Sequence, residues 1–184
     1  TLWAGGPYDP THTNALIALP EVRRLIFDGN YMEAHRLIDT NMLSRPRRQM
    51  QYQTVGDLLL DFSTAGPVEN YYRDLNLDTA IARVVYTVGG TKFTREIFSS
   101  PVDQVIVVRL TADRPGQISF SAGSKWPQQT TVRSEENHVL ILDGRNGDAQ
   151  GIKGALKFQA RVRVIAAGGK TTATPDSLSV AGAD

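Results

Sequence analysis

The first part of the chain has the hydrophobic spacing of two short helices. Between Asn14 and Met42, apolar residues recur every three or four positions, as on one face of an amphipathic helix. The Gly-Asn pair at positions 29–30 interrupts this pattern and predicts a helix end, with a second helix beginning at Tyr31. Pro20 suits the first turn of the first helix, where no backbone N–H is needed. The pattern predicts a helical hairpin at about residues 14–42.

From residue 52 onward the pattern changes to the alternation that is typical of β-strands. The predicted strands are residues 52–62, 78–88, 91–99, 104–110, 117–122, 138–143, 156–165 and 178–180. Gly89 and Gly90 separate two of these strands and predict a tight hairpin, because positive φ angles come readily only at glycine. Residues 104–110 are almost continuously apolar, which predicts a strand covered on both faces.

Many short strands with few helices predict a mainly β protein. We expect an antiparallel β-sandwich with the helical hairpin inserted near its N-terminus. A length of 184 residues fits one domain over residues 1–184. No apolar run approaches the length of a membrane-spanning helix, so the sequence predicts no membrane span.

Charge and composition narrow the classes of function. The chain has 20 Lys and Arg against 19 Asp and Glu, without the basic excess of most nucleic-acid-binding proteins, so no nucleic-acid partner is predicted. The absence of cysteine excludes disulfides, thiolate metal sites and cysteine nucleophiles. His12, His35 and His138 lie far apart in the sequence, and no pair has the spacing of metal ligands. We therefore predict no metal and no cofactor.

Carboxylates are the next candidates, because a glycosidase needs two of them flanking the scissile bond. Several occur close together in the sequence: Asp57, Asp61, Glu69, Asp74 and Asp78. Most fall on predicted strands or turns, which favours solvent-exposed or turn-capping roles. No catalytic pair is assigned to this chain.

Two polar segments each allow a functional and a structural interpretation. The acidic, glycine-containing stretch 143–148 could bind calcium, but it lacks the ligand register of an EF-hand, and a hairpin turn is favoured. The basic stretch 45–48 could bind an anion. We favour a solvated helix C-terminus, where cations interact well with the helix dipole.

Two tryptophans are the most suggestive single residues. Indole rings stack on the apolar faces of sugars, and Trp3 lies in a Gly/Pro-rich loop rather than in a periodic apolar stripe. Trp126 is the second candidate. A buried tryptophan that anchors a loop explains the pattern equally well, so both interpretations stay open. Trp3 is our candidate substrate-binding residue.

Several colinear segments, spread over nearly the whole chain, resemble glycoside hydrolase family 95. They are TLWAGGPYDP (1–10), LPEVRRLIFDG (19–29), QMQYQTVGDL (49–58), YRDLNLDTA (72–80), YTVGG (86–90), TREIF (94–98) and DQVIVVRL (103–110). A series of motifs in this order is far more specific than any single short pattern. The resemblance is weakest between residues 124 and 134.

The resemblance implies an N-terminal domain of an inverting α-L-fucosidase-like enzyme, in a family where some members prefer α-L-galactosides. The family fold is an N-terminal β-sandwich of supersandwich type, a helical linker, an (α/α)₆ barrel and a C-terminal β-domain. Its catalytic Glu and Asp belong to the barrel, so the resemblance implies no catalytic residue in this chain and an incomplete sandwich. It further implies a downstream barrel as partner, a fucosylated oligosaccharide as substrate of a bacterial parent enzyme, and a periplasmic or extracellular location.

Two functions therefore remain open. The first is a structural domain that supports a downstream catalytic barrel. The alternative is a non-catalytic carbohydrate-binding or adhesive β-sandwich module. A helical barrel with paired carboxylates beyond Asp184 would support the first function, and a linker or an unrelated domain would support the second.

Overall fold

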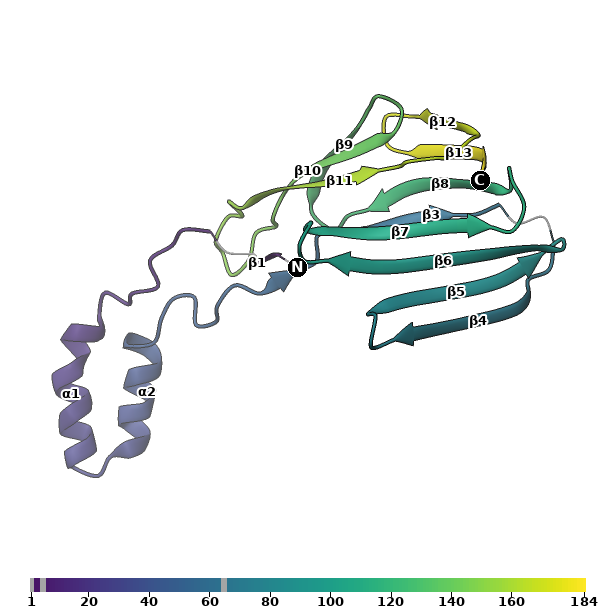
Figure 1. Cartoon of the computed structure of the whole chain (residues 1–184). Helices are drawn as coiled ribbons and strands as arrows, with labels where there is room; N and C mark the ends of the chain where they lie inside the picture. Colours follow the sequence, from purple (N-terminus) through teal and green to yellow (C-terminus); the bar gives the residue numbers. More distant parts are fainter. Residues whose placement is uncertain (1, 4–5, 64–65) are drawn as a thin grey trace. The chain divides into compact units, whose positions relative to one another are not determined.

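The computed structural model describes residues 6–63 and 66–184 in full, and residues 2–3 as backbone (Figure 1). Within these ranges the chain forms two helices near the N-terminus and thirteen strands in several sheets. This arrangement confirms the predicted mainly β fold class and is consistent with a β-sandwich. The chain forms two compact units.

The first unit comprises residues 1–55, 127–130 and 144–158. It contains the helices α1 (Ala15–Phe27) and α2 (Tyr31–Asn41), which confirm the predicted hairpin. Gly29 has a φ of +76° in the connection, a conformation that favours glycine. The hairpin closes around buried apolar side chains, namely Val22, Leu25 and Ala34.

The sequence context of Pro20 predicts that it lies in the first turn of α1, and this prediction is wrong. The helix begins at Ala15, so Pro20 occupies the sixth helical position and cannot donate to the carbonyl of Leu16. Leu16 is 80% exposed, which leaves this end of the helix accessible to water. The helix therefore extends further toward the N-terminus than a proline-initiated helix would.

The basic segment after α2 interacts with the C-terminal end of that helix. Arg45 Nη2 donates to the carbonyl oxygen of Thr40 at 3.2 Å. Arg47 donates to the carbonyl oxygen of Asp39 and forms an ion pair with the Asp39 carboxylate at 3.5 Å. These contacts confirm the interpretation of the segment as a group of cations at a helix C-terminus.

A loop between two strands forms the polar centre of the same unit. Asn146 is 2% exposed, and its Oδ1 accepts a hydrogen bond from the backbone N–H of Leu156 at 2.8 Å. The backbone N–H of Gly147 donates to Gln128 Oε1 at 3.1 Å, and that of Gly154 donates to Asp148 Oδ1 at 2.9 Å. Side-chain acceptors thus pair with backbone donors that no ladder satisfies.

The turn predicted at residues 143–147 does not form there. The strand β10 (Val139–Arg145) continues through the segment, and the chain reverses further on, where Ala149 and Ile152 form an isolated bridge. The glycine-rich composition indicated a turn, but Gly144 is needed for a different reason. A Cβ at Gly144 would lie 2.3 Å from the Phe158 ring.

The second unit comprises residues 56–126, 131–143 and 159–184. Three sheets supply its strands, of which β9–β11 also extend into the first unit. Their orders are β4 (Glu69–Asn76)–β5 (Ile81–Val88)–β6 (Thr91–Ser100)–β7 (Val105–Ala112); β12 (Lys170–Ala173)–β13 (Leu178–Ala183)–β8 (Ile118–Lys125)–β3 (Asp57–Asp61); and β11 (Lys157–Arg163)–β10–β9 (Gln129–Glu135). A small fourth sheet, which belongs to the first unit, pairs β1 (Leu2–Trp3) with β2 (Tyr52–Gln53).

The core of the second unit lies on one face of the sheet β12–β13–β8–β3. Ala122 and Leu178, both fully buried, pack with Leu140 of β10. Further along the same strands, Ile118 and Val180 pack against partly buried residues that include Leu110 of β7. This sheet therefore contacts both other large sheets through apolar side chains.

The apolar run at residues 104–110 predicted a strand covered on both faces, and this prediction is wrong at its N-terminal end. Val105 and Ile106 are 47% and 75% exposed, and β7 is an edge strand of its sheet. Only the C-terminal part of β7 reaches the core, through Leu110 and Ala112. The apolar residues at the N-terminal end of this run are therefore exposed to solvent in this chain.

Candidate functional site

One face of the sheet β4–β7 is apolar over most of its length. Residues that pair directly across antiparallel strands share a face, and residues two positions further along a strand return to it. The register gives two consecutive rows on this face: Arg73, Val84, Arg95 and Leu110, then Leu75, Ala82, Ile97 and Val108.

The two ends of this face differ in burial. At one end Leu110 packs against the core. At the other end Leu75 and Ile97 are 60% and 40% exposed, and Ile106, two residues from Val108 on the same face, is 75% exposed. We refer to Leu75, Ala82, Ile97, Ile106 and Val108 as the open apolar face.

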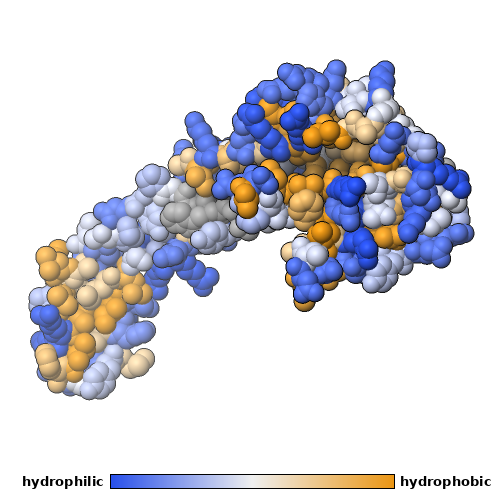
Figure 2. All heavy atoms as spheres, in the orientation of Figure 1, coloured by the Kyte–Doolittle hydropathy of each residue, from blue (hydrophilic) through white to orange (hydrophobic). Residues whose placement is uncertain are grey.

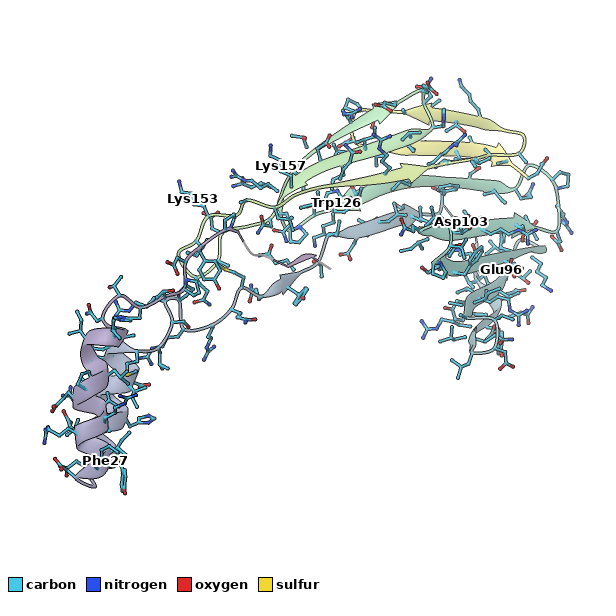
Figure 3. The ribbon with its side chains drawn as sticks, turned by 60° about the vertical axis from the view of Figure 1, so that its left-hand side comes forward. Phe27, Glu96, Asp103, Trp126, Lys153 and Lys157 are labelled. Atoms are coloured by element: carbon cyan, nitrogen blue, oxygen red, sulfur yellow. The ribbon has the colours of Figure 1, made fainter. Side chains whose placement is uncertain are left out.

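The opposite face of the sheet carries charged side chains in one cross-strand row. Arg83 Nε lies 3.1 Å from Asp74 Oδ1, and Arg109 Nη1 lies 3.3 Å from Glu96 Oε2 (Glu96 is labelled in Figure 3). Alternating charges of this kind stay solvated and discourage burial of that side. The open apolar face is thus the side of the sheet that is suited to being covered.

Arg95 lies on the apolar face, where the sheet approaches the core. Its guanidinium carbon lies 3.7 Å from the centroid of the Phe62 ring and 4.9 Å from that of Tyr86. Nη2 donates to the Tyr86 hydroxyl at 2.7 Å, and Tyr86 itself is 5% exposed. Two aromatic rings therefore hold the cation in place through cation–π contacts and one hydrogen bond.

A cavity of about 40 Å³ adjoins this arginine. The described residues that line it come from β5 to β8 and from the chain after β3; they include the apolar Leu110 and Ile118 and the polar Gln117 and Ser119. Arg95 Nε is buried, and it has no hydrogen-bond partner among the described residues.

Sequence reasoning did not select Arg95, although a signal for it existed. In β6 the side chains of Phe93, Arg95 and Ile97 alternate with those of Lys92, Thr94 and Glu96. This alternation assigns Arg95 to the apolar face, where an unpaired charge is unexpected. The residue was noted only as part of the segment TREIF.

The two tryptophans have different outcomes. Trp3 belongs to β1, where its backbone pairs with Tyr52, and its side chain lies outside the described residues. Trp126 (Figure 3) is half-buried, and its Nε1 donates to Ser124 Oγ. Its ring lies directly against the backbone of Gly56, where an added Cβ would approach Cε3 to 1.8 Å. This packing favours the anchoring role for Trp126.

The remaining candidates do not converge in the described part of the chain. No group of three or more His, Asp or Glu residues there has an arrangement that could hold a metal ion. His12 is buried beside Asn14, whose N–H donates to Nδ1 at 3.2 Å, whereas His35 is exposed. His138 lies next to Glu136, with Nε2 3.7 Å from the carboxylate.

The helical hairpin carries a second exposed apolar surface, visible in Figure 2. Its exposed large apolar side chains occur at both ends of the hairpin: Leu16, Ile17, Ile26, Phe27, Tyr31 and Met32. Phe27, at the turn of the hairpin (Figure 3), is 86% exposed. None of the helices in the described residues is long and apolar enough to cross a membrane.

The fold and these surfaces are those of a mainly β domain, consistent with a β-sandwich, whose described residues hold no group that could bind a metal ion. Comparison with known families gives a match over residues 1–184 to the model described as glycosyl hydrolase family 65, N-terminal domain. The chain therefore belongs to this family of N-terminal domains.

Two curated relatives are named as fucosidases. The chain is 39% identical over 146 residues to Alpha-L-fucosidase 2 of Arabidopsis thaliana, a match that covers 77% of this chain and 17% of the relative. It is 27% identical over 180 residues to Probable alpha-fucosidase A of Aspergillus niger, covering 94% of this chain and 22% of the relative. The chain thus spans about a fifth of the length of these relatives.

Proposed function

We propose that this chain is the N-terminal structural domain of an inverting α-L-fucosidase-like glycosidase of family 95, and that it supports a downstream (α/α)₆ catalytic barrel. The observation that carries the proposal is the match of the whole chain to an N-terminal domain model, while its fucosidase relatives are about five times longer. The reaction would then require carboxylates outside this chain.

The open apolar face supports a docking role for the domain. Exposed apolar surface in a continuous sheet face is typical of protein interfaces. Leu75, Ile97 and Ile106 continue the face through which Leu110 already packs against the core. In the parent enzyme we expect this face to be covered by further parts of the same polypeptide, including the linker or the barrel.

The remaining features of the proposal come from the family resemblance. A fucosylated oligosaccharide would be the substrate of the parent enzyme, and its location would be periplasmic or extracellular. A bacterial source stays a prediction, since the two relatives described above come from a plant and a fungus. The contact of Trp3 with substrate also stays a prediction.

We expect the 184-residue chain to have no glycosidase activity by itself, because the carboxylates for inversion would lie in the barrel. The assay is release of p-nitrophenol from p-nitrophenyl α-L-fucoside at high protein concentration. Turnover that follows the protein through chromatography, and that disappears when a carboxylate of this chain is replaced, would contradict the proposal. Saturable binding of fucosyl-α-1,2-galactose to the inactive chain would favour the carbohydrate-binding alternative.

We expect the isolated chain to self-associate through the open apolar face, because exposed apolar rows and strand edges promote association. Replacing both Leu75 and Ile106 with lysine should shift the chain toward monomer in size-exclusion chromatography with light scattering. The matched control is Ile165→Lys, since Ile165 is 82% exposed outside this face. A monodisperse monomer before any substitution, or an equal shift with Ile165→Lys, would count against the docking role.

A further inference from the structure

The chain contains two pairs of adjacent arginines, and the two pairs lie in different structural settings. Arg23 and Arg24 lie inside α1, whereas Arg47 and Arg48 lie in the segment between α2 and β2. Lys and Arg residues are adjacent nowhere else in the sequence. An endoprotease that cleaves after paired arginines recognises the same two side chains in both places, so the sequence alone does not distinguish the pairs.

The pair inside α1 is protected by its helix. Leu25, the residue that follows the pair, is buried, and Arg24 forms ion pairs with Glu21 at 2.7 Å and with Asp28 at 2.6 Å. An endoprotease binds its substrate as an extended strand, in which each residue spans about 3.3 Å, against about 1.5 Å in a helix. Cleavage at this pair therefore requires α1 to unfold first.

The second pair lacks these restraints. Residues 42–51 form neither helix nor strand, and no backbone–backbone hydrogen bond in the described chain involves Arg47, Arg48 or Gln49. All three residues are exposed, and Arg48 makes no side-chain hydrogen bond or ion pair with the described residues. Exposed irregular segments of this kind are the preferred sites of proteolytic cleavage.

The same segment carries a third cation and is fixed on both sides of the pair. Arg45 lies two positions before Arg47, and the contacts of both side chains with the end of α2 lie at the surface, where such contacts open readily. The backbone N–H of Arg45 donates to the carbonyl oxygen of Pro10 at 3.1 Å, and Met50 is 3% exposed. The pair thus lies in a short exposed stretch between two anchored residues.

We propose that the Arg48–Gln49 bond is a proteolytic modification site for an endoprotease that cleaves after paired arginines and binds them in acidic subsites. Water hydrolyses the amide bond, which leaves a carboxylate on Arg48 and an amino group on Gln49. The arginines at positions 45, 47 and 48 supply the charge that acidic subsites bind. Cleavage leaves the helical hairpin joined to the rest of the chain only through the segment before α1. The site does not depend on the proposed glycosidase function.

The direct test is limited proteolysis of the unmodified chain, followed over time by intact mass spectrometry. Trypsin needs one basic residue, and kexin needs a pair. Kexin should first produce the fragments 1–48 and 49–184, and the first cut by trypsin should also fall within this pair. In urea that unfolds the chain, trypsin should cut at both pairs. A first cut elsewhere in the native chain, or cleavage after Arg24 as fast as after Arg48, would refute the site.

Three glutamine variants separate the site from general surface accessibility. Arg48→Gln should slow cleavage by kexin at least about a hundredfold, because a subsite built for a guanidinium is then left unpaired. Arg47→Gln should block kexin but leave the bond after Arg48 open to trypsin. Arg23→Gln is the matched control, since it breaks the other pair at an exposed position and should leave the cleavage rate unchanged. Unchanged cleavage of Arg48→Gln by kexin would contradict the proposal. If a variant does not fold, the cleavage map of the unmodified chain decides.

Discussion

Replacing Gly56 with alanine is expected to destabilise the folded chain by about 3 kcal/mol, from steric overlap and backbone strain together. The new Cβ would lie 1.8 Å from Cε3 of Trp126, well inside van der Waals contact, so the indole ring would have to move. Gly56 also has a φ of +153°, a conformation that L-residues rarely adopt. For a chain of this length the melting temperature should fall by roughly 6–12 °C.

Gly123→Ala is the matched control for this substitution. Gly123 lies in β8 and has no other heavy atom within 4 Å of the position of an added Cβ. Its replacement should leave the melting temperature nearly unchanged or raise it slightly, because alanine suits a strand better than glycine. In a Trp126→Ala background the cost of Gly56→Ala should shrink to the backbone strain alone. An unchanged cost in that background would show that Trp126 does not anchor this segment.

Replacing Leu178 with alanine is expected to cost about 2–5 kcal/mol of folding free energy, through lost apolar burial and the cavity left behind. Leu178 is fully buried and packs with Ala122 and Leu140, at the point where two sheets meet. Small domains have total stabilities of about 5–15 kcal/mol, so this single change removes a large share. Chemical denaturation monitored by circular dichroism would measure the loss.

Leu77→Ala is the control for the effect of deleting a leucine side chain. Leu77 lies in the turn between β4 and β5 and is 84% exposed, so its removal should change the stability by no more than about 0.5 kcal/mol. A similar cost for both substitutions would mean that the interface between the sheets does not dominate the stability of the chain.

Local sequence signals located most of the regular elements. The hairpin between β5 and β6 follows from Gly89 and Gly90, whose φ angles of 56° and 73° favour glycine. The second helix follows from its apolar spacing and begins at the expected Tyr31. These features depend on a few neighbouring residues, which is why their positions can be inferred from the sequence.

Other elements lack such a local signal. The strand β4 was not predicted, because its residues are mostly polar and nearly all exposed, so inward and outward positions show no contrast. It forms because the backbone of β5 pairs with it from Tyr72 to Asn76 and again at Glu69, with an irregularity between these two parts. The strand β9 was likewise missed, in the segment where the family resemblance is weakest, and it is held by β10. Pairing with a distant strand overrides local propensity in both cases.

The sequence by itself determined the fold class, the helical hairpin, the absence of cysteine chemistry and the resemblance to a fucosidase family, because these depend on composition, periodicity and colinear motifs. Only the tertiary structure decided that Trp126 packs on Gly56, that Arg95 lies between aromatic rings beside a cavity, and that an apolar run in β7 is half open. The first two are contacts between residues far apart in the chain, and the third depends on which other segments cover β7. Such relations depend on strand order and register, which no local pattern encodes.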